Sequence, residues 1–307
     1  MILFDILQRV ILPIFLSVGV GVALHKAFRL DMNTLSKLLF YYYIPALAFV
    51  KIYEAKASLP LLLTVFGFLL VQFVLLFLLS LLINALCGHN RQVGTAFSNS
   101  VVLVNNGGVG IPLNDLAFAH NPLAMSIQMV VVLFEVVAVF TYGIIHTSSA
   151  HIGVRQTLRR LAKMPVFYCL LAGVVFHVCE WQVPDFLWIP LQTAANGMVA
   201  LALVAIGAQV ATVKLMYNQG RVLLSSAVRL LVAPVLSLVL LRVFGLEGIV
   251  AQVLWIASAI PSSRNSAALA LEYNNEPEFA AQAVLVSTLL SCLTLTLVVY
   301  LAPILLP

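Results

Sequence analysis

Two polar clusters interrupt apolar stretches of the sequence. Residues 103–112 read Leu-Val-Asn-Asn-Gly-Gly-Val-Gly-Ile-Pro, and residues 259–266 read Ala-Ile-Pro-Ser-Ser-Arg-Asn-Ser. Glycine costs a helix interior about 1 kcal/mol relative to alanine, and proline costs about 3 kcal/mol, so we expect helices to break at both clusters. A break frees backbone amides and carbonyls, and lipid cannot pair with these groups. The clusters should therefore face protein or a water-filled cavity.

Anion binding is the chemistry that such breaks favour. Each break creates the N-terminus of a half-helix, whose free amides and partial positive charge attract a carboxylate. The planar guanidinium of Arg264 also suits a carboxylate. Interrupted helices at matching positions in two halves of a chain are typical of transport sites. The predicted substrate-binding residues are Asn105, Asn106, Gly108, Pro261, Ser262, Ser263, Arg264 and Asn265.

The alternative for these clusters is a pair of packing kinks. Glycine and proline are common in membrane helices, and Gly107 and Gly108 could simply allow a close helix contact. Side-chain polar groups at both breaks favour the binding site.

Several charged residues fall within apolar segments. A charge at mid-membrane costs about 3 kcal/mol on insertion scales, so Arg264 and Glu135 should each face a partner or a cavity. Glu135 is a candidate protonation site that couples transport to a proton gradient, or else a counter-ion of Arg264. Asp115 is a second candidate coupling residue, which caps the helix after Pro112 or lies near a cation. Arg229 lies toward a helix end and can extend to the membrane surface.

The composition predicts the elements that must position these residues. Of 307 residues, 63% are hydrophobic and 9% are charged, whereas a soluble domain has about 25% charged residues. This excludes a soluble enzyme, a disordered chain and a nucleic-acid binder. A membrane span needs about 20 residues, so about ten spans fit. We predict an all-α polytopic membrane protein with helices near 4–25, 33–53, 58–86, 93–118, 121–146, 164–180, 187–212, 221–245, 248–273 and 277–303.

Ten helices divide into two sets of five. We predict a first repeat at 1–147, a basic cytoplasmic linker at 148–163 and a second repeat at 164–307. Because five is odd, the second repeat must enter the membrane inverted, as in secondary transporters. Basic loops stay in the cytoplasm, and their distribution places both termini outside the cell membrane (plasma or inner membrane).

The sequence has no HExxH or GxSxG motif and no paired aspartates within a span. We therefore expect no enzymatic activity, no metal and no other cofactor, with a proton or a sodium ion as the coupling ion. The expected partners are the lipid bilayer and a small organic anion, and no nucleic acid.

Five segments, in their order and spacing, resemble the auxin efflux carrier family, which includes plant PIN carriers and bacterial malonate or malate permease-like proteins. The segments are 43–47, 105–113, 205–209, 261–273 and 287–291. The resemblance implies two inverted five-helix repeats, a crossover at the broken fourth and ninth helices, carriage of carboxylates or related anions, and a homodimer. By position, Asn105 and the Pro261–Ser262 pair lie at the crossover. Plant members have Pro-Asn in the fourth helix, where this chain departs with Val104-Asn105.

Together these features predict a secondary active transporter that moves a small organic anion, a carboxylate, by alternating access under a proton or other gradient. The alternatives are a sodium-coupled symporter of the bile-acid type and a passive anion channel.

Overall fold

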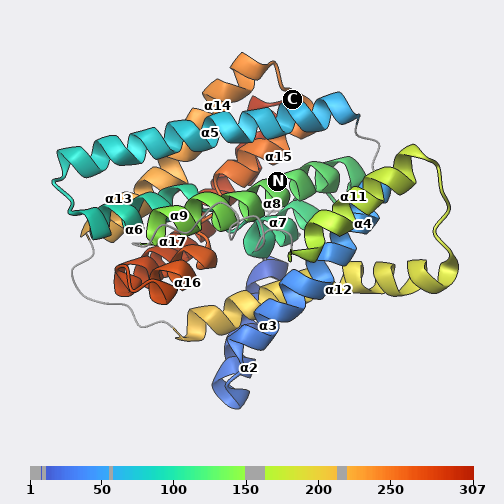
Figure 1. Ribbon diagram of the computed structural model, residues 1–307, viewed down its shortest axis with the longest axis horizontal. Helices are drawn as coiled ribbons and strands as arrows, with labels where there is room; N and C mark the ends of the chain where they lie inside the picture. Colours follow the sequence, from blue (N-terminus) through green and yellow to red (C-terminus); the bar gives the residue numbers. More distant parts are fainter. Residues whose placement is uncertain (1–7, 9–11, 55–57, 149–162, 213–219) are drawn as a thin grey trace.

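The computed structural model describes residues 8, 12–54, 58–148, 163–212 and 220–307, and these are almost entirely helical (Figure 1). The described part of the chain contains one isolated β-bridge and no strand. The predicted all-α class is therefore confirmed. The predicted basic linker lies outside the described residues apart from its two ends, so the orientation in the membrane stays a prediction.

Within the described ranges, six helices are long and apolar enough to cross a membrane. Their bounds are Met32–Tyr53, Pro60–Leu86, Pro122–Thr147, Asp185–Ala211, Gly220–Phe244 and Pro277–Leu305. Three of them contain a π-helical turn. Their segments are α3 (Met32–Leu38), η2 (Leu39–Tyr43) and α4 (Ile44–Tyr53); α8 (Pro122–Ala138), η4 (Val139–Gly143) and α9 (Ile144–Thr147); and α13 (Gly220–Ala227), η5 (Val228–Val232) and α14 (Ala233–Phe244).

The other three long helices are regular, and the remaining helices are shorter. The long ones are α5 (Leu59–Leu86), α12 (Asp185–Thr212) and α17 (Pro277–Leu305). The shorter ones are α2 (Leu12–Phe28), α6 (Arg91–Val102), η3 (Asn106–Gly110), α7 (Ile111–Ala117), α11 (Pro165–Val178), α15 (Gly248–Ser258) and α16 (Arg264–Glu272). Each of the ten predicted segments thus contains helical residues, and two of the segments are interrupted.

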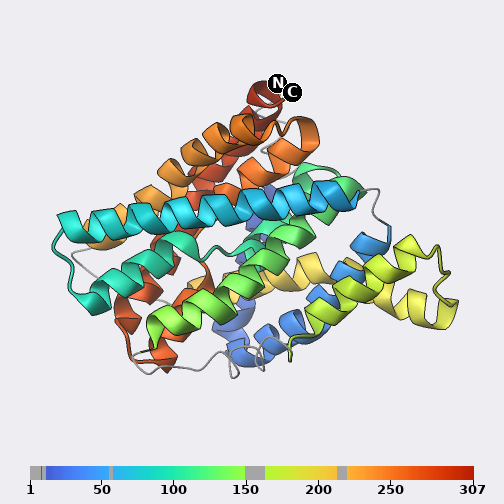
Figure 2. The ribbon, with the colours of Figure 1, turned by 45° about the horizontal axis from the view of Figure 1, so that its top comes forward.

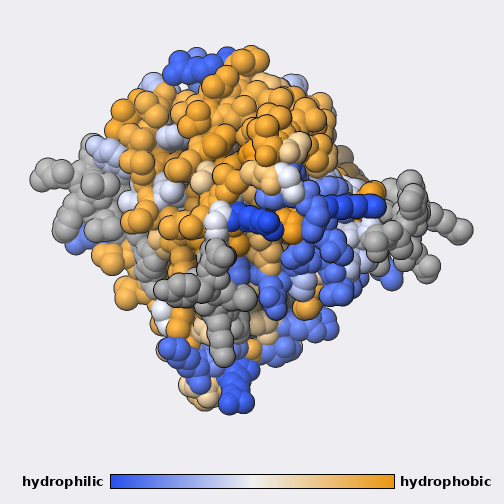
Figure 3. Space-filling model, turned by 90° about the vertical axis from the view of Figure 1, so that its left-hand side faces the viewer, coloured by the Kyte–Doolittle hydropathy of each residue, from blue (hydrophilic) through white to orange (hydrophobic). Residues whose placement is uncertain are grey.

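Helix α5 shows why these segments fit a bilayer. It has no charged residue in 28 positions, and a helix that is apolar on all sides must be buried in protein or lipid. Leu63, Leu78 and Leu82 on α5 are exposed on the molecule's surface. Figure 3 shows an apolar surface, in orange, over much of one side of the protein.

The helices pack into two groups (Figures 1 and 2). We call α2, α3–η2–α4, α11 and α12 the side bundle, seen at the lower right in both views. We call the rest, α5 to α9 and α13 to α17 with their π-turns, the crossover bundle. The two bundles meet where α12 and α4 contact η3, α7 and α8. Each half of the chain therefore contributes its first helices to the side bundle and its later helices to the crossover bundle.

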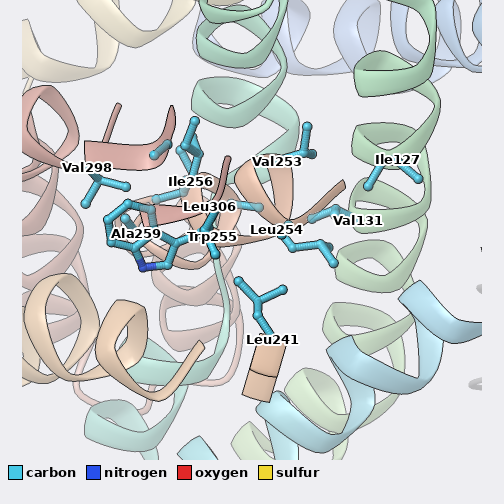
Figure 4. Close-up of a cluster of buried hydrophobic side chains, with 14 of the residues drawn as sticks. Ile127, Val131, Leu241, Val253, Leu254, Trp255, Ile256, Ala259, Val298 and Leu306 are labelled. Atoms are coloured by element: carbon cyan, nitrogen blue, oxygen red, sulfur yellow. The ribbon is translucent and has the colours of Figure 1, made fainter. Parts of the chain in front are cut away.

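The crossover bundle has a buried apolar core around α15 (Figure 4). Leu254 and Trp255 pack there with Val131 of α8 and Leu241 of α14. The indole nitrogen of Trp255 donates a hydrogen bond to the carbonyl of Pro234 at 3.0 Å, which satisfies the polar atom of a buried ring. This core fixes α15, the helix that leads into the second polar cluster.

In the side bundle, α2 and α12 approach until their backbones touch. A Cβ atom at Gly207 would lie 2.0 Å from the carbonyl oxygen of Val18, and one at Gly21 would lie 2.2 Å from that of Val204. Only glycine allows this distance, as in other close contacts between membrane helices. Gly207 lies in one of the family-like segments, and its role in this structure is packing.

Candidate functional site

Both polar clusters break their helices, and the two breaks pair with each other. α6 ends at Val102 and η3 begins at Asn106, while α15 ends at Ser258 and α16 begins at Arg264. Between these ends, two extended segments run antiparallel and form the bridge between Val104 and Ser262.

Backbone hydrogen bonds join the extended segments. The amide of Asn105 donates to the carbonyl of Pro261 at 3.0 Å, and the amide of Ser263 donates to the carbonyl of Leu103 at 2.8 Å. The groups that the breaks free thus satisfy each other inside the protein, as a lipid environment requires. We call this paired region the crossing. Pro112 is not part of the first break, because it lies in the first turn of α7.

Ser262 fastens the crossing to its surroundings. Its hydroxyl donates to the carbonyl of Ser100 at 2.5 Å, and its amide donates to the hydroxyl of Ser287 on α17 at 3.1 Å. Its side chain is 1% exposed. The hydroxyl and amide of Ser262 are therefore engaged within the protein.

The C-terminal ends of α6 and α15 share one partner, Arg229 of η5. Its Nη1 donates to the carbonyl of Val101 at 3.0 Å, and its Nη2 donates to the carbonyl of Ser258. Arg229 is only 1% exposed, so the expectation that it extends to the membrane surface is wrong. The two negative helix ends hold it in the interior.

Glu135 of α8 contacts the two helix N-termini that follow the crossing, those of η3 and α16. Its carboxylate accepts from the amide of Gly107 at 2.9 Å and from the hydroxyl of Ser263 at 3.4 Å. Both donors lie at the start of a half-helix, where the helix dipole favours negative charge. Gly107 is thus not a packing glycine, and its amide binds a carboxylate.

Glu135 does not pair with Arg264. The two are near enough to attract each other, but no ion pair joins them among those found for the described residues. These two described residues thus form no direct ion pair, and the choice between a counter-ion of Arg264 and a protonation site at Glu135 stays a prediction. Arg264 itself makes no hydrogen bond or ion pair with any described residue.

Arg264 lines a small cavity between the two bundles. The crossover bundle contributes Asn105, Gly107, Gly108 and Arg264 to its wall. The side bundle contributes Leu39, Phe40, Ile44, Ala202, Ala205, Ile206 and Gln209. An adjoining cavity shares Asn105, Ile206 and Gln209 and extends to Leu285 and Thr288 of α17. We call the first cavity the interface cavity; its lining combines apolar side chains with a few polar groups, as the walls of ligand sites do.

Asn105 and Gly108 form the start of η3 at this cavity. The side-chain oxygen of Asn105 accepts from the amide of Gly108 at 3.2 Å, as an N-cap does. A Cβ atom at residue 108 would lie 2.6 Å from that oxygen, so the cap requires glycine there. The sequence predicted both residues for the site, and the structure places both in the wall.

The other predicted site residues lie outside the interface cavity. Asn106 is buried on the opposite side of the crossing, where its carbonyl accepts from Gln128 at 3.3 Å. The amide of Asn265 donates to the capping hydroxyl of Ser263 at 3.2 Å. Asp115 lies toward the end of α7 and binds Nδ1 of His120 at 2.8 Å. Of the predicted substrate-binding residues, Asn105, Gly108 and Arg264 therefore line the interface cavity, and the others do not.

Sequence reasoning missed Arg229 as a residue of the crossing. It lies within the span Gly220–Phe244, well away from both ends. The rule that flagged Arg264, a charge inside an apolar segment, applies equally to Arg229. Another small cavity lies beside it and is also lined by Gln72, Asn106 and Glu135.

Comparison with known proteins identifies the family of this chain. The model of the membrane transport protein family, the family of the auxin efflux carriers, matches residues 9–299. An uncharacterized transporter of Methanothermobacter thermautotrophicus is 21% identical over 277 residues, which cover 87% of this chain and 88% of the relative. The chain therefore belongs to the membrane transport protein family of the auxin efflux carriers and is an integral membrane transporter.

Proposed function

We propose that this transporter is a secondary active carrier of a small organic anion, a mono- or dicarboxylate, and that the anion binds in the interface cavity. The observation that carries the proposal is Arg264, a cation in the cavity wall whose side chain has no hydrogen-bonding or ion-pairing partner among the residues that the structure describes. An unpaired arginine in a membrane protein is costly. A carboxylate would supply the missing partner with two charge-assisted hydrogen bonds.

The rest of the wall fits the same ligand. Gly108 lies in the first turn of η3, where the partial positive charge of a half-helix supports an anion. The side-bundle wall is apolar except for Gln209. Its apolar side chains would contact the carbon skeleton of the bound anion. Gln209 adds a polar side chain to the apolar side.

The position of the cavity supports alternating access. Its walls belong to two bundles, so a movement of one bundle against the other would open it first to one side of the membrane and then to the other. The antiparallel pairing at residues 103–105 and 261–263 fits two repeats of opposite orientation. We therefore retain inverted repeats at 1–147 and 164–307, with the linker in the cytoplasm and both termini outside the cell membrane.

Glu135 is the proposed coupling residue. Gly107 lines the interface cavity while its amide donates to the Glu135 carboxylate. A bound anion thus places a second negative charge close to that carboxylate, and uptake of one proton by Glu135 removes the repulsion. Asp115 is not in either cavity wall, so we assign the coupling to Glu135 alone.

Uptake into proteoliposomes tests the function. We expect a labelled mono- or dicarboxylate to accumulate under an imposed pH gradient, and a protonophore to abolish the accumulation. Liposomes that contain Arg264→Ala protein serve as the matched control. The proposal fails if no carboxylate enters above the level of empty liposomes under any gradient, or if electrical recordings show flux at channel rates.

A further inference from the structure

Arg229 occupies a position that differs from that of an ordinary buried ion pair. Its guanidinium joins the carbonyl of Val101, in the last turn of α6, to the carbonyl of Ser258, the last residue of α15. Glu135 and Arg229 line the same cavity, but no ion pair joins them among the described residues. The negative charge that faces Arg229 is therefore that of two helix ends.

Carbonyls at the C-terminal ends of helices have no partner within the helix and carry partial negative charge. In carriers with broken helices, such carbonyls coordinate the cation that drives transport, commonly sodium. In this chain a guanidinium already binds one carbonyl from each broken helix. The guanidinium of Arg229 therefore lies where a bound cation would otherwise neutralise the two helix ends.

We infer that Arg229 is a resident cation that takes the place of a coupling sodium ion at the crossing. Because the guanidinium is covalently attached, it neutralises the two helix ends throughout the transport cycle and is never released. The carrier then runs without sodium. This inference rests on the proposed function for its statement about transport, whereas its statement about the crossing can be measured without any substrate.

The space around Arg229 allows a direct test by chemical rescue. The space that the shortened side chain leaves, together with the small cavity beside Arg229, gives a small cation room to enter. In Arg229→Ala, the carbonyls of Val101 and Ser258 lose their donor. Arg229→Met also removes the charge but fills the space with an apolar chain. Arg242→Ala, which removes an exposed arginine of α14, is the matched control.

The readout is the thermal unfolding temperature of each purified variant in potassium chloride, sodium chloride or guanidinium chloride at equal millimolar concentration. We expect Arg229→Ala to unfold at least about 5 °C below the wild type in potassium chloride. Guanidinium should restore at least half of that loss by binding the folded state. Guanidinium should not restore Arg229→Met, and Arg242→Ala should match the wild type. Equal unfolding temperatures of Arg229→Ala in all three salts would overturn the inference.

Wild-type uptake gives a second test that needs no variant to fold. Replacement of sodium by potassium on both sides of the proteoliposome should leave carboxylate uptake unchanged, and uptake that requires sodium would overturn the inference. Absence of carboxylate uptake in both salts would instead count against the proposed function, and the unfolding experiment would still decide the role of Arg229.

Discussion

The two broken helices have two C-terminal ends and two N-terminal ends at the crossing, and the two pairs of ends differ in their hydrogen-bond partners. The C-terminal ends of α6 and α15 are joined by the buried Arg229 through two carbonyls. The N-terminal ends, at η3 and α16, are only partly satisfied by Glu135 and by capping side chains. They also border a cavity with an unpaired arginine. We call the C-terminal ends with Arg229 the closed side, which stabilises the fold. We call the N-terminal ends with the interface cavity the open side, where we propose that the substrate binds.

This contrast separates two arginines that look alike in the sequence. Both lie in apolar segments beside the crossing. The guanidinium of Arg229 donates to two backbone carbonyls, whereas the side chain of Arg264 hydrogen-bonds to none of the described residues. Removal of the first should therefore affect folding, and removal of the second should affect transport. Four substitutions test this division between a structural arginine and a substrate-binding arginine.

The largest effect is expected from Arg264→Ala. Loss of the charged partner of a bound carboxylate should reduce uptake by about 100-fold, because one side of a desolvated charge pair is removed. The unfolding temperature should stay at or above that of the wild type, since the side chain of Arg264 hydrogen-bonds to none of the described residues. Initial uptake rates and thermal unfolding of the same preparation check both parts. A variant that does not fold would place Arg264 with the structural residues.

Glu135→Gln should separate binding from coupling. Glutamine keeps an oxygen that can accept from Gly107 but carries no charge and cannot take up a proton. Exchange of labelled substrate across the membrane should persist. The roughly tenfold accumulation that one pH unit can drive through a single proton should be lost. Accumulation that still follows the pH gradient would remove Glu135 from the coupling role.

Ser287→Ala tests whether Ser262 belongs to the closed side. The substitution leaves the buried amide of Ser262 without its acceptor, and an unsatisfied buried donor costs about 1–3 kcal/mol. Chemical or thermal unfolding should show that loss, while the affinity for substrate in the folded protein stays unchanged. Ser291→Ala, which removes a hydrogen bond within the same helix, is the control. A change in affinity with no change in stability would move Ser262 to the open side.

The smallest effect is expected from Asp115→Asn. Asp115 binds the exposed His120 away from both cavities, so uptake and its dependence on the pH gradient should change by less than about twofold. A loss of gradient-driven uptake comparable to that of Glu135→Gln would restore Asp115 as a coupling residue.

The sequence was sufficient to predict the elements, because their signals are local. Apolar runs predicted the helices within a few residues, and glycine, proline and asparagine predicted both breaks. Helix propensity and hydropathy depend on neighbouring residues, so they can be read without a structure.

The partners across the crossing could not be predicted in the same way. Ser262 and Ser100, which hydrogen-bond to each other, are 162 residues apart in the chain. A match of opposite charges in the sequence offers only Glu135 as a partner for Arg264, whereas helix ends in this structure supply charge without a charged residue. The same omission hid Arg229, whose partners are both backbone carbonyls.

The most direct test of the open side is a thermal stabilisation screen of mono- and dicarboxylates on the wild type, Arg264→Ala and Arg264→Lys. At least one carboxylate should raise the unfolding temperature of the wild type, since a ligand of the folded state stabilises it. The same compound should leave Arg264→Ala unchanged and stabilise Arg264→Lys only partly. Equal stabilisation of the wild type and Arg264→Ala, or none of the wild type by any carboxylate, would contradict an anion site at Arg264.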